Sequence, residues 1–574
     1  MPAPGRGRRG RPRGRPRGPR ARPPCPPRPT PPNPARPSSP PRPGGGARRG
    51  GGGGAPPPPH ADGKAPGPRA AAEPEVRPLG RIVPVPASVA PGGAPYALTS
   101  ATRIGVNTAS REVREIGDYL AGLLRPATGL PLPVVDEQAA RGGIRLRLSA
   151  ADTALGDEGY RLRSGPGGIT LTAHRPAGLF RGVQTLRQQL PSAVERGTVQ
   201  KGPWKVAGGT ITDTPRYAYR GAMLDVARHF FTVDEVKRYI DQLALYKVNT
   251  LHLHLSDDQG WRIAVDSWPR LTTHGGSTEV GGGPGGSYTK EEYKEIVRYA
   301  ASRHQEVIPE IDVPGHTNAA LASYPELNCD GVAPPLYTGT KVGFSSLCVP
   351  KQVTYDFVDD VIREIAALTP GRYLHIGGDE AHSTSHADYV AFMDRVQPVV
   401  AKYGKKVIGW HQLTGTTPAP GALVQYWGLD RTPAEEKERV AAAARNGTGL
   451  VLSPADRTYL DMKYTKETKL GLSWAGYVEV RRSYDWDPAA YLPGAPASAV
   501  KGVEAPLWTE TLATTGDLDV MAFPRLPGVA ELGWSPAATH DWDAYKVRLA
   551  EQAPRFEALG IDWYRSPEVP WPAE

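Results

Sequence analysis

Alternating strand and helix patterns over residues 216–574 constrain the fold of this 574-residue chain more than any other feature. Short apolar runs bounded by turn residues predict strands, and apolar residues at helical spacing follow several of them. Eight parallel strands joined by helices indicate a (β/α)8 barrel, with an open doubly wound sheet as the alternative. The predicted strands are Ala222–Val226, Thr250–Leu255, Glu306–Ile311, Tyr373–Ile376, Lys406–Trp410, Leu423–Trp427, Gly449–Leu452 and Val503–Trp508.

Two helices of this region have clear N-terminal signals. Thr232 is followed three residues later by Glu235, and Thr289 by Glu292, which is the capping-box pattern. We therefore expect helices to begin at these two points, each with one apolar face.

Residues 78–215 predict a smaller α+β domain ahead of the barrel. Gly143–Ser149 and Gly159–Arg163 alternate apolar and polar residues, and Gly168–Ala173 is a further strand candidate. Gly178–Leu190 has apolar residues at helical spacing. This segment contains no catalytic constellation, so we expect a packing domain.

Residues 1–77 account for the basic character of the chain. They hold 17 Lys/Arg and three Asp/Glu, whereas the remainder holds 52 basic and 56 acidic residues, so the net charge of +10 does not belong to the folded body. A segment of Arg, Pro and Gly with few apolar residues cannot bury a core, and we expect it to be disordered. An RNA-binding arm is the alternative. Because no aromatic residues are interleaved with the arginines, we expect no nucleic-acid partner.

The N-terminus lacks the apolar stretch of a secretory signal, and no run reaches the ~18 apolar residues of a membrane span. Taken literally, these features indicate a soluble, cytoplasmic protein. A start codon assigned too far upstream would instead hide a real signal, and this hypothesis rests on the low-complexity composition. N-terminal sequencing of the native protein tests it, and a mature end near Met1 would contradict it.

Three cysteines are present, none with metal-type spacing. Cys25 lies in the N-terminal segment, while Cys329 and Cys348 flank one Gly/Pro-rich loop. A disulfide across that loop, which would imply an oxidising compartment, and two free thiols are both open interpretations.

Asp379 and Glu380 form an acid pair directly after the strand Tyr373–Ile376. The intervening Gly377-Gly378 lets the backbone leave the strand and lets a ligand come close. An acid pair at a strand end suits general acid chemistry on a sugar or acyl group. The alternative is a solvated acid pair on the surface, and the residues around Asp379 and Glu380 distinguish the two interpretations.

Polar and aromatic residues collect at the ends of the other predicted strands. In a barrel these ends form the functional face. Trp recurs at three of them, and aromatic faces combined with carboxylates and Arg are what sugars require. The residues concerned include Asp225, Arg228, Asp257, His316, Trp410, Trp427, Asp456, Tyr459, Asp461, Trp508 and Glu510.

Four motifs resemble glycoside hydrolase family 20, the β-N-acetylhexosaminidases, especially bacterial secreted members. The likeness runs from about Pro78 to Trp563 and follows the family's order. The motifs are Leu224-Asp-Val-Ala-Arg-His-Phe230, His252-Leu-His-Leu-Ser-Asp-Asp-Gln-Gly-Trp-Arg262, Glu310-Ile-Asp-Val-Pro-Gly-His316 and His375-Ile-Gly-Gly-Asp-Glu-Ala-His382.

This resemblance implies exo-acting, retaining hydrolysis of terminal β-linked GlcNAc or GalNAc, without cofactor or metal. The family is a substrate-assisted exception among glycosidases. Glu380 would be the general acid and then the base, while the substrate's own 2-acetamido oxygen attacks and forms an oxazolinium. Asp379 would orient the acetamido group. The partner is thus a carbohydrate, with chitin oligosaccharides and host glycans both open.

Further roles follow from the resemblance residue by residue. Arg228 would bind the outer hydroxyls with Glu510, and Asp257 with His316 would support the acid. Trp410, Trp427 and Trp508 would surround the acetamido methyl, Tyr459 would bond the acetamido oxygen, and Asp461 would bind near the C6 hydroxyl. Cys329 and Cys348 match a loop disulfide of bacterial relatives, and the resemblance implies secretion.

Two rival functions remain to be weighed. His252-x-His254 on a strand, with His316 and His375, could begin the metal site of a metal-dependent deacetylase, although packed barrel histidines are the simpler interpretation. A non-catalytic carbohydrate-binding protein on the same fold is the other rival. The intact acid pair argues against it, since a binder needs no general acid.

Overall fold

The computed structural model describes residues 76–573, so all but two residues of the predicted disordered segment lie outside the described part. Within the described part no helix is both long and apolar enough to cross a lipid bilayer.

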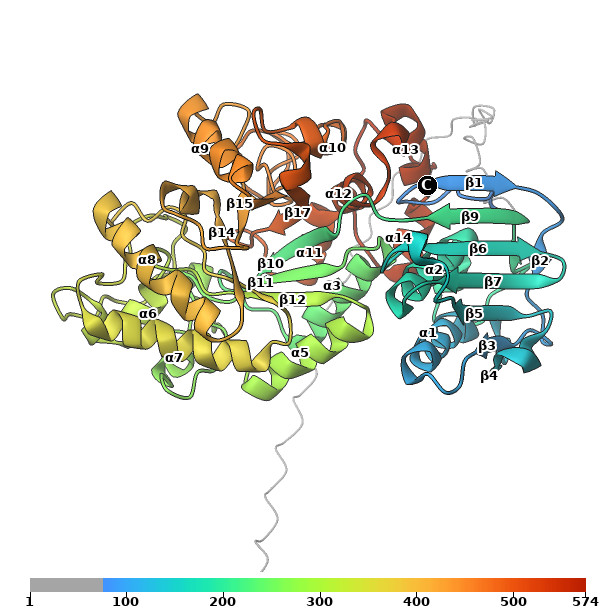
Figure 1. Cartoon of the computed structure of the whole chain (residues 1–574), viewed down its shortest axis with the longest axis horizontal. Helices are drawn as coiled ribbons and strands as arrows, with labels where there is room; N and C mark the ends of the chain where they lie inside the picture. Colours follow the sequence, from blue (N-terminus) through green and yellow to red (C-terminus); the bar gives the residue numbers. More distant parts are fainter. Residues whose placement is uncertain (1–75, 574) are drawn as a thin grey trace, which may run out of the picture. The chain divides into compact units, whose positions relative to one another are not determined.

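Eight parallel strands close into a barrel, which confirms the predicted fold class (Figure 1). Each predicted strand is found, and the first and last extend further toward their N-terminal ends than expected. The strands are β10 Tyr219–Asp225, β11 Thr250–His254, β12 Glu306–Glu310, β13 Tyr373–His375, β14 Lys406–Trp410, β15 Leu423–Tyr426, β16 Gly449–Leu452 and β17 Val500–Leu507.

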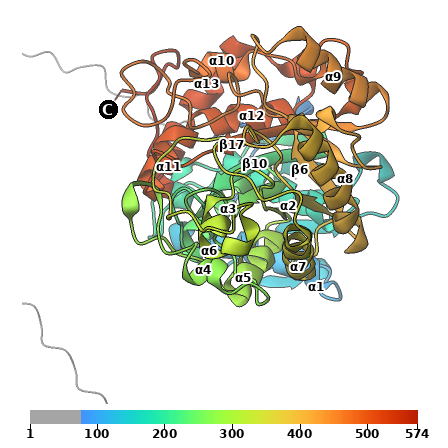
Figure 2. The ribbon, with the colours of Figure 1, turned by 90° about the vertical axis from the view of Figure 1, so that its left-hand side faces the viewer.

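Helices surround the barrel, as the end view shows for α3, α5, α7 and α8 around β10 and β17 (Figure 2). Both predicted capping boxes form, at Thr232 and Thr289. The helices are α3 Val233–Leu245, α4 Arg270–Thr273, α5 Lys290–Ser302, α6 Asn318–Ser323, α7 Gln352–Leu368, α8 His386–Lys402, α9 Ala434–Arg445, α10 Val480–Tyr484, α11 Thr515–Ala522, α12 Arg525–Trp534, α13 Trp542–Ala550 and α14 Ala553–Leu559.

The smaller domain contains a seven-stranded mixed sheet in the order β1-β9-β6-β7-β5-β3-β4. Helices α1 and α2 pack on one face, and the alternating exposed residues of β5 and β6 show that the other face is open to solvent (Figure 1). The elements are β1 Ser88–Pro91, β2 Tyr96–Ala97, β3 Ile104–Val106, α1 Arg111–Thr128, β4 Val134–Asp136, β5 Ile144–Leu148, β6 Tyr160–Gly165, β7 Gly168–Ala173, α2 Pro176–Gln189, β8 Lys205–Val206 and β9 Gly209–Asp213.

Helix α1 was not predicted, although its sequence carries the signals of a helix. Ser110 caps its N-terminus, and Val113, Ile116 and Leu120 are buried at helical spacing. This apolar spacing lies ahead of Pro126, which stands only in the last turn, so the signal was present in the sequence and was overlooked.

A buried ion pair joins the two domains. Asp213 at the end of β9 accepts hydrogen bonds from Lys247 Nζ at 2.9 Å and from Trp534 Nε1 at 2.9 Å, and both charged side chains are fully buried. Tyr160 of β6 also donates to Asp213, at 2.6 Å. Since Lys247 and Trp534 belong to the barrel, one carboxylate fixes the smaller domain against it.

Removing that carboxylate should be costly, because Lys247 would remain buried without a counter-ion. We expect Asp213→Ala to lower the free energy of unfolding by about 3–5 kcal/mol, measured by urea denaturation. Glu115→Ala, which breaks the exposed pair with Arg111, is the control and should cost less than about 1 kcal/mol. Equal effects of the two substitutions would contradict this account of the junction.

Candidate active site

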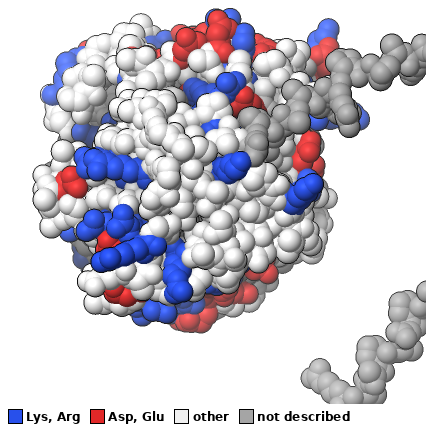
Figure 3. Space-filling model, turned by 90° about the vertical axis from the view of Figure 1, so that its right-hand side faces the viewer, with Lys and Arg blue, Asp and Glu red and all other residues white. Residues whose placement is uncertain are grey.

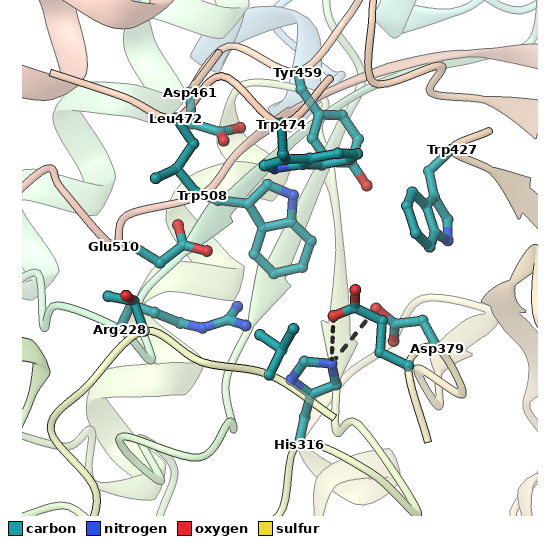
Figure 4. Close-up of a pocket in the computed structure, with 13 residues that line it drawn as sticks. Arg228, His316, Asp379, Trp427, Tyr459, Asp461, Leu472, Trp474, Trp508 and Glu510 are labelled. Carbon is teal, nitrogen blue, oxygen red and sulfur yellow. Dashed lines mark ion pairs between the residues drawn. The ribbon is translucent and has the colours of Figure 1, made fainter. Parts of the chain in front are cut away.

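A cavity of about 490 Å³ opens at the C-terminal end of the barrel strands (Figure 4). In the figure Arg228, Glu510 and Asp461 lie at one side, and Asp379 and Trp427 at the other. Every lining residue follows a barrel strand or lies on a loop beyond one. They are Arg228, His316, Thr340, Val342, Asp379, Glu380, Trp427, Tyr459, Asp461, Leu472, Trp474, Trp508 and Glu510.

Two glycines turn the chain from β13 into the acid pair. Gly377 and Gly378 have φ angles of 63° and 95°, which favour glycine. A Cβ on Gly377 would lie 1.7 Å from the Oδ1 atom of Asp312. The group that comes close to Gly377 is therefore the Asp312 side chain of the protein itself. The sequence had predicted a ligand at this place.

His316 connects the two acids. Its Nε2 lies 3.4 Å from Glu380 Oε2 and 3.7 Å from Asp379 Oδ2, the contacts dashed in Figure 4, and its Nδ1 lies 3.2 Å from Asp257 Oδ1. Burial opposes protonation of His316, but the charges of Asp257 and Asp379 outweigh it and raise the pKa well above its usual range. His316 is thus an imidazolium that stabilises negative charge on both acids.

Asp257 in turn holds the arginine of the cavity. Arg228 Nη2 lies 2.8 Å from Asp257 Oδ2, and the guanidinium lies over the Trp508 ring at 4.8 Å. Burial would raise the pKa of Asp257, but Arg228 and His316 outweigh it and hold that pKa well below its usual range. Asp257 is therefore a permanent anion that orients a cation on either side.

Asp312 supports Asp379 from below the cavity. Burial and then the Asp379 charge raise the pKa of Asp312 well above its usual range, so Asp312 keeps its proton and hydrogen-bonds Asp379. Burial also raises the pKa of Asp379. The two acids are coupled, and the hydrogen bond from Asp312 together with the charge of His316 opposes the rise in the pKa of Asp379.

Several polar atoms of the cavity wall are buried without a hydrogen bond to any described residue. They include Arg228 Nε, Asp379 Oδ1 and Glu510 Oε2. Burial and then Glu510 also raise the pKa of Asp461 well above its usual range. Because buried polar groups in proteins are normally paired, these atoms indicate a polar ligand with several donors and acceptors.

A second layer of charge lies beneath the cavity, inside the barrel. Glu310 Oε2 lies 2.9 Å from His252 Nε2 and 2.5 Å from His254 Nδ1, while Glu310 Oε1 lies 2.9 Å from His375 Nδ1. His252 also contacts Glu504 at 2.8 Å, and His254 contacts Asp257 at 2.7 Å. All of these side chains are buried.

This arrangement does not favour the metal site considered for the histidines. Ligand atoms of His252, Glu310 and His375 lie within 4.8 Å of one another. However, both ring nitrogens of His252 and both of His254 already face carboxylates. These imidazoles act as hydrogen-bond donors within a charge network, and a metal ligand needs a free lone pair.

The aromatic wall differs in part from the sequence expectation. Trp427 and Trp508 line the cavity as expected, whereas Trp410 is fully buried and does not line it. Trp410 packs behind Trp508, with ring centroids 5.8 Å apart, and donates from Nε1 to Glu310 Oε1 at 2.9 Å. Its expected role beside the acetamido methyl stays a prediction.

Sequence reasoning missed Trp474, Leu472, Thr340 and Val342, which also line the cavity. The first two lie in the long segment between β16 and β17, and the other two lie between β12 and α7. None follows a strand closely, so the strand-end rule could not find them. Trp474 is a 41% exposed Trp beside the site, and an exposed aromatic is the available hint.

Cys329 and Cys348 form a disulfide, the pairing that the resemblance implies. The loop that it closes carries Thr340 and Val342 to the cavity. Ser383, three residues beyond Glu380, donates to Gly343 O of this loop at 2.9 Å. The disulfide thus restrains a cavity wall that contacts the acid-bearing segment.

The fold is a (β/α)8 barrel. At its strand ends an acid pair contacts one histidine and faces a cavity with aromatic walls, and this arrangement is that of a glycoside hydrolase. Comparison with protein families agrees. Residues 217–537 match the catalytic domain of glycosyl hydrolase family 20, and residues 80–214 match domain 2 of the same family. The chain belongs to glycosyl hydrolase family 20.

Individual relatives are similar over most of the chain. A β-N-acetylhexosaminidase of Cellulomonas fimi is 45% identical over 481 residues, which cover 84% of this chain and 95% of the relative. A family 20 β-N-acetylhexosaminidase structure from Streptomyces coelicolor A3(2) is 76% identical with a TM-score of 0.85, covering 87% of this chain and 100% of that chain. A mutant Streptomyces plicatus β-hexosaminidase in complex with its product GlcNAc has the same identity and TM-score, covering 88% and 99%.

The buried histidines predict how stability depends on pH. Burial opposes their protonation, but Glu504 and Glu310 raise the pKa of His252 to about 10, and Glu310 raises that of His254 to about 9. In the unfolded chain each pKa returns to about 6.5. Between pH ~6.5 and the raised pKa values, the folded state binds more protons than the unfolded chain. The two histidines therefore stabilise the fold fully below pH ~6.5, and this stabilisation is lost as the pH rises through 9–10.

We therefore expect the free energy of unfolding, measured by urea denaturation between pH 6 and 10, to fall with rising pH. His252→Gln should reduce that slope by up to about 1.4 kcal/mol per pH unit, the value for one proton. An unchanged slope in the variant would show that His252 is neutral in the folded protein.

Proposed function

We propose that this protein is an exo-acting β-N-acetylhexosaminidase that releases terminal β-linked N-acetylhexosamine with retention of configuration. The observation that carries the proposal is the placement of Asp379 and Glu380. Both face one cavity, and their oxygens lie with His316 Nε2 within 4.8 Å of one another. Their adjacency on one strand end supports the substrate-assisted mechanism of this family, in which Glu380 handles the proton, Asp379 holds the acetamido group and the sugar supplies the nucleophile.

The first step cleaves the glycosidic bond. Glu380 gives its proton to the glycosidic oxygen, and the acetamido carbonyl oxygen attacks C1 as the C1–O bond breaks. The aglycone leaves as an alcohol, and an oxazolinium ion remains with its positive charge on the amide nitrogen. Asp379, whose anionic form is favoured by the Asp312 hydrogen bond and by His316, accepts the amide N–H and stabilises that charge.

The second step restores the enzyme. The Glu380 carboxylate takes a proton from water, whose oxygen adds to C1 from the side that the aglycone left, and the C1–O bond of the oxazolinium breaks. The His316 imidazolium at 3.4 Å stabilises the Glu380 anion between the two steps. Two inversions at C1 give net retention.

The remaining cavity side chains select the sugar. Arg228, Glu510 and Asp461 gather at the side opposite Asp379, where they would bind ring hydroxyls and close the cavity to a second sugar beyond the terminal one (Figure 4). Tyr459 and the faces of Trp427 and Trp508 would enclose the acetamido group, with Tyr459 bonding its oxygen. This closed end supports exo action. The choice between GlcNAc and GalNAc depends on the contacts of the 4-hydroxyl.

Secretion is part of the proposal. The disulfide between Cys329 and Cys348 supports it, because such bonds persist in oxidising compartments. N-terminal sequencing of the protein recovered from culture medium tests this, and recovery in the cytoplasm alone would contradict it.

A panel of aryl glycosides tests the reaction. We expect hydrolysis of aryl N-acetyl-β-glucosaminide and no significant hydrolysis of the β-glucoside, which lacks the internal nucleophile. The β-galactosaminide measures tolerance at the 4-hydroxyl. Equal kcat/KM on the glucoside and the glucosaminide would refute substrate assistance.

Substitutions separate the two acids. Glu380→Gln should lower kcat/KM by about 10²- to 10⁴-fold on a substrate with a poor leaving group, and much less on a dinitrophenyl glycoside, whose leaving group needs no proton. Asp379→Asn should lower it by ~10²-fold or more on both substrates. If Glu380→Gln lowered both equally, Glu380 would not be the acid.

A further inference from the structure

The open face of the sheet in the smaller domain carries a cluster of arginines that the proposed reaction does not use. In β5 Ile144 and Leu146 point into the core, whereas Arg145 and Arg147 point to solvent, and β6 adds Arg161 and Arg163 on the same face. Figure 3, which looks along the strands of this sheet from the side of the smaller domain, shows Lys and Arg side chains gathered toward the left of the view.

Strand pairing arranges these side chains in two rows. Arg145 and Arg163 both pair with Thr170 of β7, and Arg147 and Arg161 both pair with Thr172. Each row therefore reads Arg–Thr–Arg across β5, β7 and β6. The arginine backbones of one row are ~10 Å apart, and the rows are ~7 Å apart along the strands. We call these six residues the Arg–Thr–Arg face.

The Arg–Thr–Arg face is hollow, and carboxylates pair with only some of its arginines. A cavity of about 480 Å³ is lined by all six residues together with Leu148, Ser149 and Asp152. Arg147 pairs with Glu137 at 2.7 Å and Arg161 with Asp152 at 3.4 Å. Within the described residues no carboxylate pairs with Arg145 or Arg163. Arg145 instead donates to Thr170 Oγ1 at 2.9 Å, so two of the four guanidinium charges face solvent without a carboxylate partner among the described residues.

The chemistry of the face points to one kind of occupant. Residues 1–77 are strongly basic, and a symmetric dimer through this face would oppose arginines with arginines, so both are disfavoured. Arg binds carboxylate and sulfate in a bidentate manner, while Thr and Ser bind hydroxyls. The lining contains no aromatic side chain on which bases could stack. An acidic polysaccharide supplies both anions and hydroxyls at sugar spacing.

The face lies far from the catalytic cavity. Helix α2 packs between the sheet and the barrel, where Arg181 donates to His304 O at 2.6 Å and Gln188 donates to Leu245 O at 3.2 Å. Those two acceptors precede β12 and β11, at the N-terminal end of the barrel strands, whereas the catalytic cavity lies at the C-terminal end. An occupant of the Arg–Thr–Arg face would not contact the sugar being cleaved.

We propose that the Arg–Thr–Arg face binds the carboxylate or sulfate groups of an acidic polysaccharide and anchors the enzyme to it. This inference does not require the proposed hydrolysis, since the two sites are separate. Binding should weaken with salt, because the contacts are exposed and ionic.

Fluorescence anisotropy with labelled oligogalacturonate and heparin oligosaccharide tests the proposal, the former carrying carboxylates and the latter also sulfates. Arg145→Gln/Arg163→Gln is compared with Arg111→Gln/Arg114→Gln, which removes the same charge from exposed positions on α1. We expect roughly tenfold or greater loss of affinity in the first variant, little loss in the second, and unchanged kcat/KM on aryl glycoside in both. Equal losses in the two variants would overturn the proposal.

Because residues 1–77 also attract anions, a site-resolved readout is needed on the full chain. Arginine modification by phenylglyoxal, followed by mass spectrometry, should show protection of Arg145, Arg147, Arg161 and Arg163 by either oligosaccharide. A neutral dextran oligosaccharide should not protect them. Protection confined to the N-terminal segment, or tighter binding of a DNA oligonucleotide at this face, would overturn the proposal.

Discussion

Glu310 is buried at the centre of the barrel, and the active site depends on how its charge is balanced. A buried carboxylate without partners is very costly, yet this one contacts three imidazoles and Trp410. Acidic side chains and imidazoles alternate from the barrel interior to the cavity, and the acids raise the pKa values of His252, His254 and His316. The order is Glu504, His252, Glu310, His254, Asp257, His316 and Glu380.

This alternation explains why two adjacent acids can take different roles. Both acids lie beside the His316 imidazolium, and Asp379 is in addition hydrogen-bonded to Asp312, whose pKa is raised. The Asp312 hydrogen bond favours the anionic form of Asp379, which is the form that can accept an amide N–H. Gly377 makes the arrangement sterically feasible, because a side chain there would collide with Asp312. The local turn and the buried charges thus act together.

Strand ends were predictable from the sequence because apolar runs and turn residues mark them, and the residues placed there include most of the cavity. Arg228, Tyr459 and Glu510 were found in this way. Trp474 and Val342 were not, because they reach the cavity from long segments without periodicity. The depth of Trp410 was also beyond sequence reasoning, since period-2 patterning does not say which of two neighbouring Trp rings lies nearer the cavity. Helix α1 was predictable from its apolar spacing and its Ser110 cap but was overlooked.

The central claim is that the protein supplies the proton and the charge stabilisation, while the sugar supplies the nucleophile. The most direct test measures kcat/KM for aryl glucosaminides whose N-acetyl group carries zero, one, two or three fluorines. The account predicts a steep fall with each fluorine, because the carbonyl oxygen becomes a weaker nucleophile. Rates independent of fluorination would contradict it and would place the nucleophile on the protein.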